Sequence, residues 1–574
     1  MKQDLNEGLT LSSDGKASVR RAGRLNVLHM QGTDMEMAGQ HAELLQKEAT
    51  AGLLPFMAGY LTGHVKHQKK GLDKLITKGV VDGICRKVAK NMPRGQLQAF
   101  YRLAQGIGMT NKQAEIALGT ADTLLILFAG ASWITKWATG LARAMPFACS
   151  GIVVSPEASA NGHLLHGRNL DYDGLGYWDN NHTVAFLKPQ TSQPYGFIST
   201  AGIHTVGLTG FNASGIFAAV NTAPTRDCSS RGEPLFAVME RMVRTARDLD
   251  DAISILAASR IASGYNIHIS HGPSGRSALV EIAYSGMAVR YPEDGILLAT
   301  NHYLTDKMAV TMPEIPLVDL RNSKGRLNRL RQLFKDTGGI DKDFVANALR
   351  DRIEFENGAM HPLGDVVCNY VNLSSIVADV TEGRIWVASG NAPVALSDYI
   401  GFDIHKEWDE FNRPPSYRLE NIGMPDDIEG LKCTRLFQEA HKAMVHNGDP
   451  DMGVKYLSEA IRLCPNEPNL LLSGSMAAIS AGKIKQARDL AEAYLLKTPK
   501  TDARRFRAHL VLAWIAQINR DAAEAKQQMD TAIDLANDDA TRFEVEWWIH
   551  RRPLDRQGLR KFHVDLFCGR RLMF

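Results

Sequence analysis

Cys149 and two charged residues that follow it, Arg168 and Asp171, are the residues of this sequence best suited to chemistry. Cys149 comes just before the apolar run Ile152–Val154, so we expect it at the start of a strand. A thiol at a strand start, facing a guanidinium and a carboxylate, is a layout for nucleophilic catalysis. The cysteine alone would not support this prediction, because a free cysteine is more often a small buried hydrophobe. The prediction therefore depends on later segments of the chain.

Three further polar segments follow the cysteine in a characteristic order. They are Gly167–Asp173, Gly210–Ile216 continuing to Asn221, and Ala299–Tyr303 around Asn301. With Cys149–Gly151 in front of them, these segments resemble the N-terminal nucleophile (Ntn) hydrolases of the acyl-coenzyme A:6-aminopenicillanic acid acyltransferase type, peptidase family C45. Choloylglycine hydrolases, penicillin V acylase and acid ceramidase are more distant relatives with the same order of motifs. The resemblance covers roughly residues 24–403.

The resemblance implies a role for each residue of the predicted site. Arg168 would hold the Cys149 thiolate by its charge, and Asp171 would accept a hydrogen bond from the Cys149 amine and orient it. Asn301 would be the side-chain donor of an oxyanion hole, and Asn221, or a backbone N–H near it, would be the second donor. Each such donor is worth roughly 2.7–4 kcal/mol at a developing oxyanion.

A further site residue is Arg326, which falls near the distal Ser-x-x-Arg of the family. Its neighbours Arg321 and Arg329 are rival candidates for the same role. The sequence departs from the family at several points, among them a slightly longer gap between Cys149 and Arg168 and the added C-terminal repeats. Ala148 stands where glycine or another small residue is usual, and His41 is followed by alanine rather than glycine.

The resemblance also implies that the chain is cut before Cys149. An α-amine has a reference pKa of about 7.7–8.0, so the new N-terminus would be a base beside its own thiol, which is only partly ionised at neutral pH. The cut can be autocatalytic, because the Cys149 thiol can attack the Ala148 carbonyl and give a thioester that water hydrolyses. Residues 1–148 would then be a helical propeptide that stays bound as a small subunit.

Structural interpretations of the same residues are the alternative. Cys149 would then be a core cysteine, and Arg168 with Asp171 a simple ion pair at a strand end. Asn301 would cap a turn, and Asn221 begins the turn-like segment Asn-Thr-Ala-Pro. The histidines of this region have no helical metal-binding spacing and no carboxylate-rich partner motif, so we expect no metal and no cofactor.

The elements that must position these residues change character at Cys149. Before it, apolar residues recur at helical spacing after a strand at Arg24–Met30, and the first residues, up to about Arg21, are polar and expected to be loose. After it the period changes to two, and short strands alternate with turns rich in Gly, Asn and Pro. With the resemblance, this pattern predicts an α+β fold, a four-layer αββα Ntn-hydrolase sandwich of antiparallel sheets, over residues 149–405.

The C-terminal part has a different organisation. Beyond a charged, Pro-containing linker at residues 406–430, every segment has a helical pattern. Gly448 and Gly482 are 34 residues apart, and so are Pro465 and Pro499. This period resembles tetratricopeptide repeats, which we expect over residues 431–550, with a tail at 551–574. The repeats predict a surface for a protein partner or for self-association.

The composition limits the class of protein. The chain has 574 residues, 44% hydrophobic and 22% charged, which is an ordinary globular balance. Its net charge of +3 gives no reason to expect a nucleic-acid partner. The 7 cysteines are scattered and odd in number, which favours reduced thiols in a cytoplasmic protein. The longest apolar run, Leu124–Ile134, is too short for a transmembrane helix, and the first residues do not have the pattern of a secretory signal.

These observations predict an autoproteolytically activated cysteine enzyme that cleaves or forms a linear amide through an acyl-thioester on Cys149. Its substrate would be a small-molecule amide or acyl thioester, and the apolar helices before Cys149 favour an acyl chain. The alternative is a catalytically silent scaffold whose repeats bind protein partners. The sequence leaves open the acyl group, the amine, and whether water or an amine accepts the acyl group.

Overall fold

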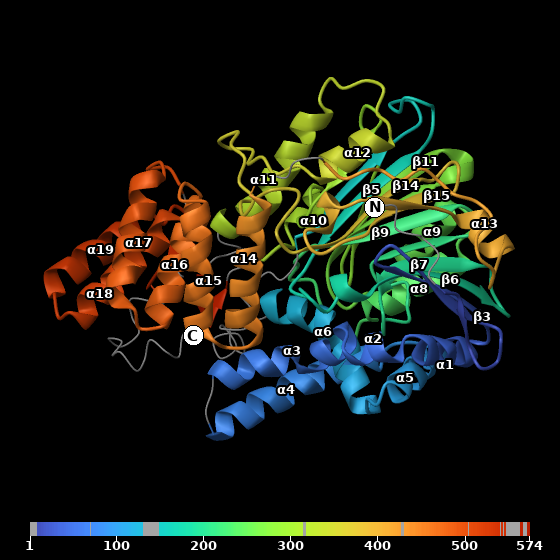
Figure 1. Ribbon diagram of the computed structural model, residues 1–574, viewed down its shortest axis with the longest axis horizontal. Helices are drawn as coiled ribbons and strands as arrows, with labels where there is room; N and C mark the ends of the chain where they lie inside the picture. Colours follow the sequence, from blue (N-terminus) through green and yellow to red (C-terminus); the bar gives the residue numbers. More distant parts are fainter. Residues whose placement is uncertain are drawn as a thin grey trace.

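Two stacked β-sheets with helices on both outer faces form the body of the computed structural model (Figure 1). The structure describes residues 8–68, 71–129, 148–313, 317–425, 430–502, 504–539, 541–542, 545–546, 563–565 and 571–573. In Figure 1 the N-terminal helices lie along one edge of this body and the C-terminal helices lie beside it.

The larger sheet has ten strands in the described part of the chain, in the order β1-β2-β3-β6-β7-β8-β9-β10-β11-β12. All neighbours pair antiparallel except β3 and β6, which run parallel. The strands are β1 (Thr10–Leu11), β2 (Ser18–Ala22), β3 (Leu25–Gly32), β6 (His182–Pro189), β7 (Tyr195–Thr200), β8 (Thr209–Asn212), β9 (Ile216–Thr222), β10 (Tyr265–His271), β11 (Arg276–Ile282) and β12 (Met287–Arg290).

The smaller sheet has six strands in the described residues, in the order β13-β4-β5-β14-β15-β16, all antiparallel. They are β13 (Ile296–Ala299), β4 (Ser150–Val154), β5 (Leu165–Asp171), β14 (Asn372–Asp379), β15 (Arg384–Ala388) and β16 (Tyr399–Asp403). A separate pair, β17 (His563–Asp565) and β18 (Arg571–Met573), lies near the C-terminus of the chain.

Strand β4 shows how the layers are built. Val153 packs into the core between the sheets, whereas Ile152 and Val154 pack on the opposite face, against helices. Successive side chains of a strand point to opposite faces, so a strand buried on both faces is apolar throughout. The outer helices are α8 (Leu235–Thr245) and α9 (Leu249–Ala257) on the larger sheet, and α11 (Leu317–Phe334) and α12 (Lys342–Leu349) on the smaller one. This order of helix, sheet, sheet and helix confirms the predicted fold class.

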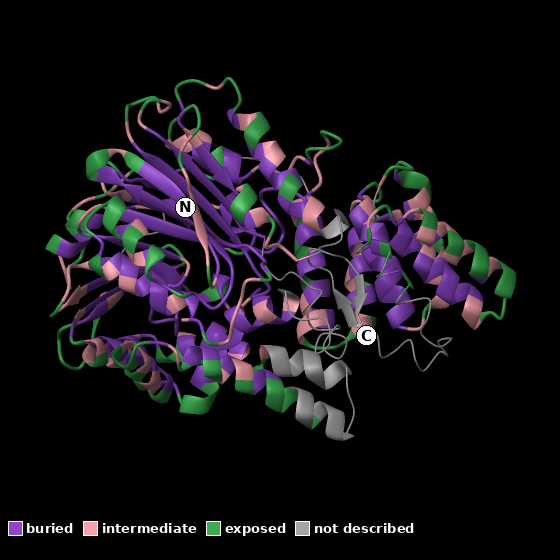
Figure 2. Cartoon of the chain, turned by 180° about the vertical axis from the view of Figure 1, so that it is seen from behind, coloured by how far each residue is buried: buried purple, intermediate pink, exposed green. Residues whose placement is uncertain are grey.

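Burial follows these layers. In Figure 2 the strands are buried almost throughout, whereas many helices expose one face. No helix in the described ranges combines the length and the apolar character needed to cross a bilayer.

The residues before Cys149 contribute strands as well as helices. β3 confirms the strand predicted at Arg24–Met30 and pairs with β6 over seven residue pairs. The expectation that the chain is loose up to Arg21 is wrong, because Ser18–Ala22 form β2 with alternate residues buried. Three of its five residues, Ser18, Arg20 and Arg21, are polar, and this hid its period. The helices that follow are α1 (Asp34–Leu44), α2 (Gln46–Thr50), α3 (Leu53–Gln68), α4 (Gly71–Ala89), α5 (Arg94–Gly106) and α6 (Asn111–Ala129).

The C-terminal region is helical, and each helix packs against the next (Figure 1). Its elements are α14 (Leu431–His441), the π-helix η4 (Lys442–His446), α15 (Pro450–Leu463), α16 (Pro468–Ser480), α17 (Ile484–Lys497), α18 (Arg505–Ile518) and α19 (Ala522–Asp534). Helices α15 and α17 begin at Pro450 and Ile484, which are 34 residues apart. The assignment to tetratricopeptide repeats stays a prediction.

The segment predicted as a linker at residues 406–430 is structured at its start. Helix α13 (Ile404–Asp409) runs into it, and Trp408 is buried in the core between the sheets. Ile422 forms a β-bridge with Tyr399 of β16. The linker prediction therefore needs correction here: proline and charged residues dominate the local pattern, but the charges of α13 include a buried one, Glu407.

Glu407→Ala is expected to destabilise the fold by roughly 3–5 kcal/mol, because removing one partner leaves a buried charge uncompensated. Glu407 accepts hydrogen bonds from Arg20 of β2, from Tyr417 and, at 2.9 Å, from His29 of β3. Denaturant unfolding measures the change. Asp409→Ala, at an exposed position of the same helix, is the control and should leave the transition unchanged. Equal transitions for the two variants would contradict the prediction.

Candidate active site

Cys149 lies at the start of β4, as predicted, and its side chain is 2% exposed. β4 pairs with β5 on one side and β13 on the other, so Gly151 lies opposite both Arg168 and Ala299. Glycine is required at this position, because a Cβ there would lie 2.4 Å from the ring of His268. The strand that carries the thiol is therefore held closely on both sides.

The guanidinium of Arg168 lies beside this thiol, in the space between the two sheets. Its Nη2 lies 3.9 Å from the Sγ of Cys149 and donates to the Val220 carbonyl at 3.0 Å. Its Nη1 donates to the Thr209 hydroxyl at 3.2 Å. Val220 and Thr209 belong to the larger sheet, so Arg168 reaches from β5 of one sheet to β8 and β9 of the other. Two acceptors thus fix a buried positive charge beside the sulfur.

Burial raises the pKa of the Cys149 thiol. The charges of Arg168 and Arg326 lower this pKa, and the charge of Asp171 raises it further. The Cys149 thiol of the uncut chain is therefore protonated at neutral pH. It needs a base before it can act as a nucleophile.

Asp171 is buried at the end of β5, beside the thiol. Its Oδ1 accepts a hydrogen bond from the Asn372 side chain at 2.9 Å, whereas its Oδ2 has no hydrogen-bond partner in the described part of the chain. Burial raises the pKa of this carboxyl to about 7, although Arg326, Asn372 and Arg168 lower it. The Oδ2 atom is thus an available acceptor next to the predicted nucleophile.

Site residues hold the backbone on both sides of the bond between Ala148 and Cys149. The Ala148 N–H donates to the main-chain oxygen of Asp171 at 3.1 Å, and the Cys149 N–H donates to the Oδ1 of Asn301 at 2.8 Å. The sequence predicts a bond from the Cys149 nitrogen to the Asp171 carboxylate instead. In the uncut chain this nitrogen is an amide with a single hydrogen, and that hydrogen goes to Asn301.

Asn301 and Arg326 meet at this nitrogen. Arg326 donates from Nη2 to the Oδ1 of Asn301 at 2.8 Å, and from Nη1 to the Cys149 carbonyl and, at 2.9 Å, to the Ser150 hydroxyl. The Nδ2 of Asn301 donates to the main-chain oxygen and the hydroxyl of Thr222, both at 3.0 Å. The predicted oxyanion donor is therefore occupied by Thr222 in this state.

Of the three arginines considered for the distal position, the structure brings Arg326 to the site. Arg321 pairs with Glu356, and Arg329 pairs with Asp351 at 2.7 Å. All three lie on α11, but only Arg326 occupies the turn of the helix that faces β4.

Asn221 supports the loop that carries Asn301. Its Nδ2 donates to the Ala299 carbonyl at 3.1 Å, and its Oδ1 has no partner in the described residues. Asn266, its neighbour in β10, donates to the Thr300 carbonyl at 3.1 Å. The side-chain amide of Asn221 thus donates into this loop, and its predicted role as an oxyanion donor is not visible in the uncut chain.

Three hydroxyl groups complete the site. The sequence did not predict a role for them. Thr209 accepts from Arg168, Thr222 accepts from Asn301, and the Ser323 hydroxyl accepts the Asn301 N–H at 2.8 Å. The signal for Ser323 was present, since it is the serine of the Ser-x-x-Arg segment. Thr209 begins β8 and Thr222 ends β9. Threonine is common at such positions, so the sequence gives no comparable signal for these two residues.

A group of metal-ligand type lies two residues beyond Asp171. One atom each of Asp173, His441 and His446 lie within 4.8 Å of one another. The Asp173 Oδ1 lies 2.6 Å from the Nε2 of His441 and 2.9 Å from the Nε2 of His446. Burial alone would raise the pKa of Asp173, but the two histidines hold it well below its ordinary value. These contacts join α14 and η4 of the C-terminal region to the end of the site strand.

A family model matches the part of the chain that holds most of these residues. Residues 158–392 match the family model described as Acyl-coenzyme A:6-aminopenicillanic acid acyl-transferase. This range of the chain is therefore similar to the family over most of the two stacked sheets. The matched range includes Arg168, Asp171, Asn221, Asn301 and Arg326, whereas Cys149 lies just before it.

Among solved structures, part of this chain is similar to a Caenorhabditis elegans N-acylethanolamine-hydrolyzing acid amidase (NAAA) ortholog. The match has 14% identity and a TM-score of 0.29, and it covers 41% of this chain and 93% of that chain. The comparison with curated proteins found no match. The family supports amide hydrolysis or acyl transfer as the general chemistry of an enzyme.

The free energy of unfolding of the uncut chain is expected to fall as the pH rises, because of Asp171. Its pKa is 3.8 when unfolded and about 7 when folded. Folding therefore binds a proton between these values, so this group costs stability as the pH rises from about 4 to about 7. Three pKa units correspond to roughly 4 kcal/mol at most. Asp171→Asn removes the dependence.

Denaturation of Cys149→Ala and of Cys149→Ala with Asp171→Asn tests this prediction on chains that stay whole. The free energy of unfolding of the double variant, relative to the single one, should rise by a few kcal/mol between pH 4 and pH 8. Parallel pH profiles would show that Asp171 ionises normally in the fold.

Proposed function

We propose that this protein is a cysteine Ntn enzyme that cuts its own chain before Cys149 and then cleaves or forms a linear amide. The observation that carries the proposal is the Arg168 guanidinium, 3.9 Å from the Cys149 sulfur, with Asp171 beside it. A buried cation at a thiol favours the thiolate, which is the nucleophilic form.

Self-cleavage begins at the bond between Ala148 and Cys149. The sulfur attacks the Ala148 carbonyl carbon, the carbon–nitrogen bond breaks, and the Cys149 nitrogen takes up the thiol proton and becomes an amine. Water then hydrolyses the Ala148 thioester, which releases the thiol and leaves a carboxyl group on Ala148. Hydrogen bonds to Asp171 and Asn301 support this step, because they hold the N–H groups on both sides of the bond.

In the cut enzyme the Cys149 amine acts as the base for its own thiol. The Oδ2 of Asp171, which has no partner in the described uncut chain, is the acceptor that orients this amine. The thiolate then attacks the carbonyl of a linear amide, the amine leaves with a proton, and an acyl-thioester remains on Cys149. Water completes a hydrolysis, and an amine acceptor completes an acyl transfer.

The N-terminal segment remains attached after the cut as a small subunit. Its strand β3 pairs with β6 over seven residue pairs. Asp122 of α6 accepts hydrogen bonds from Ser263 and Tyr265 at 2.7 Å each and from the Leu235 N–H at 3.2 Å. These contacts survive the cut, because they do not involve residues next to Ala148.

The substrate we propose is an N-acyl amide. The family supports amide or acyl-transfer chemistry. The helices before Cys149 supply apolar surface for an acyl chain: α3 and α6 contribute Leu53, Leu54, Leu124 and Leu125 to the same hydrophobic cluster as Cys149.

Intact-mass analysis of the purified protein tests the proposal. Scaled from 63.2 kDa, residues 1–148 correspond to about 16 kDa and residues 149–574 to about 47 kDa. We expect both fragments to elute together, the larger one to begin with Cys149, and the cut protein to turn over N-acyl amides. A chain that stays whole on prolonged incubation and is inactive on a panel of such amides would contradict the proposal. It would favour the alternative of a catalytically silent scaffold.

A further inference from the structure

Arg326, which holds the main-chain carbonyl of the proposed nucleophile Cys149, is itself held by a residue of its own helix. The Nε of Arg326 donates to the Oδ1 of Asn322, one turn earlier on α11, at 3.1 Å. The Nδ2 of Asn322 donates in turn to the Oδ1 of Asp365 at 3.0 Å. All three residues are buried, so no solvent competes for these bonds.

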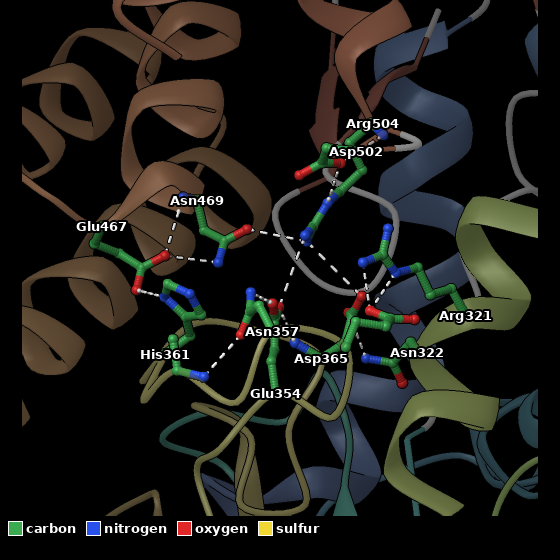
Figure 3. A network of polar contacts seen from close by, with 12 residues as sticks. Arg321, Asn322, Glu354, Asn357, His361, Asp365, Glu467, Asn469, Asp502 and Arg504 are labelled. Atoms are coloured by element: carbon green, nitrogen blue, oxygen red, sulfur yellow. Dashed lines mark hydrogen bonds and ion pairs between the residues drawn. The ribbon is translucent and has the colours of Figure 1, made fainter. Parts of the chain in front are cut away.

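The next partner of Asp365 comes from the C-terminal region (Figure 3). The Nη1 of Arg504 lies 3.8 Å from the Oδ2 of Asp365, and its Nη2 lies 3.7 Å from the Oε1 of Glu354. The same guanidinium contacts Asp502 and donates to the Oδ1 of Asn469 at 3.0 Å. Arg504 is therefore a buried cation between the C-terminal helices and two carboxylates of the Ntn domain.

These contacts form one continuous polar path from Arg504 through Asp365, Asn322 and Arg326 to the Cys149 carbonyl. Each side chain fixes the orientation of the next. The oxygen of the Asn322 amide accepts from Arg326, and its nitrogen donates to Asp365. This orientation of the amide requires that Asp365 is an acceptor. Arg504 places a positive charge 3.8 Å from this carboxylate.

A second contact braces the opposite side of the site. Asp173 follows Asp171 by two residues and binds His441 and His446. Gln438 of α14 donates to the carbonyls of Tyr370 and Ala392 at 2.6 and 2.9 Å. The C-terminal helices thus contact both the segment that follows Asp171 and the loop that carries Asp365.

We propose that the C-terminal helical region is part of the active-site scaffold, and that Arg504 is a positioning residue that acts on Arg326 through Asp365 and Asn322. This inference rests on the proposed role of Arg326 at Cys149. It gives the C-terminal region a function inside the enzyme that does not require a protein partner.

Arg504→Gln in the full-length chain is the first test. The variant keeps a long polar side chain and removes the charge. We expect self-cleavage and kcat to fall at least tenfold, with KM changed less than threefold, because the nucleophile is misplaced and the substrate site is intact. Arg504→Lys should recover part of the loss, because it restores the charge beside Asp365.

Arg505→Gln is the matched control. Arg505 donates to the Leu495 carbonyl at 2.7 Å and to Thr498, so these bonds stay within the C-terminal region. Its loss should change the melting temperature of the protein without changing cleavage or kcat. Equal kinetic effects of Arg504→Gln and Arg505→Gln would reduce the role of Arg504 to general stability and overturn the proposal.

Asn322→Leu keeps the test decisive if Arg504→Gln fails to fold. It breaks the path between Asp365 and Arg326 and leaves the contact between the two regions intact. It should reproduce the loss of kcat at an unchanged KM, and wild-type kinetics in this variant would overturn the proposal.

A last readout separates this inference from the proposed function. The rate at which iodoacetamide alkylates Cys149, followed by peptide mass spectrometry against pH, reports the thiol whether or not the chain is cut. If wild type is neither cut nor active, the proposed function fails, but a shift of this pH profile in Arg504→Gln would still support the path. An unshifted profile would overturn it.

Discussion

Replacing Cys149 by alanine is expected to leave the chain as one piece of 63.2 kDa and to lower amide turnover by about 10⁴-fold or more. The sulfur is needed twice, first to attack the Ala148 carbonyl and then to carry the acyl group of the substrate. Alanine removes the nucleophile and should leave the fold intact, because the substitution removes only the sulfur atom of a small buried side chain. Intact mass and turnover of N-acyl amides are the two measurements.

The matched control is Cys368→Ala, since Cys368 is also buried but lies in a different hydrophobic cluster. Burial and the charge of Asp171 raise the pKa of the Cys368 thiol, and the charges of Arg352 and Arg350 only partly offset this rise. This variant should be cut and active like wild type. A Cys149→Ala chain that is still cut at the same bond would disprove the role of the sulfur.

The sequence predicted that Cys149 lies near Arg168 and Asp171 because the strand patterns around them are strong. Ile152–Val154 form a continuous apolar run, which is typical of a strand buried on both faces, and this puts Cys149 at a strand start in the interior of the fold. Arg168 and Asp171 lie three residues apart at the end of the next strand. Pairing of β4 with β5 then brings all three together.

The partners of these residues could not be predicted in the same way. The Cys149 nitrogen binds Asn301 rather than Asp171, and this depends on whether the nitrogen is an amide or an amine, which is a chemical state and not a pattern. Asn221 has the residue type of an oxyanion donor, yet its amide is used to hold the Ala299 loop. Such choices depend on contacts between strands that are far apart in the chain.

Buried charges were the other source of error. Glu407 lies in the segment predicted as a linker and Arg504 in the predicted repeats, and both are buried although charged residues are rarely buried without a partner. Their partners, Arg20 and Asp365, are distant in sequence and give no local signal. The structured start of the predicted linker and the path from the C-terminal helices were therefore not visible in the sequence.

Arg168→Met is expected to slow self-cleavage and amide turnover by roughly 10²–10³-fold at pH 7. Two unit charges 3.9 Å apart interact by about 4 kcal/mol at an effective dielectric constant near 20, which corresponds to about three pKa units. Methionine fills much of the same volume without the charge, so the pKa of the Cys149 thiol rises and less thiolate is present at neutral pH. The pH profile of kcat/KM should therefore move to higher pH by one unit or more.

A graded series makes this prediction specific to charge. Thr209→Val removes one acceptor of Arg168 and keeps the guanidinium, so it should lower turnover by less than tenfold with little shift of the pH profile. R168K keeps a positive charge but loses the fixed geometry of two acceptors, so its loss should fall between the other two. If Arg168→Met retained the wild-type pH profile while turnover fell, the arginine would be a structural link between the sheets. A shift that follows the charge in the order Thr209→Val, R168K and Arg168→Met would establish that the guanidinium sets the reactivity of the thiol.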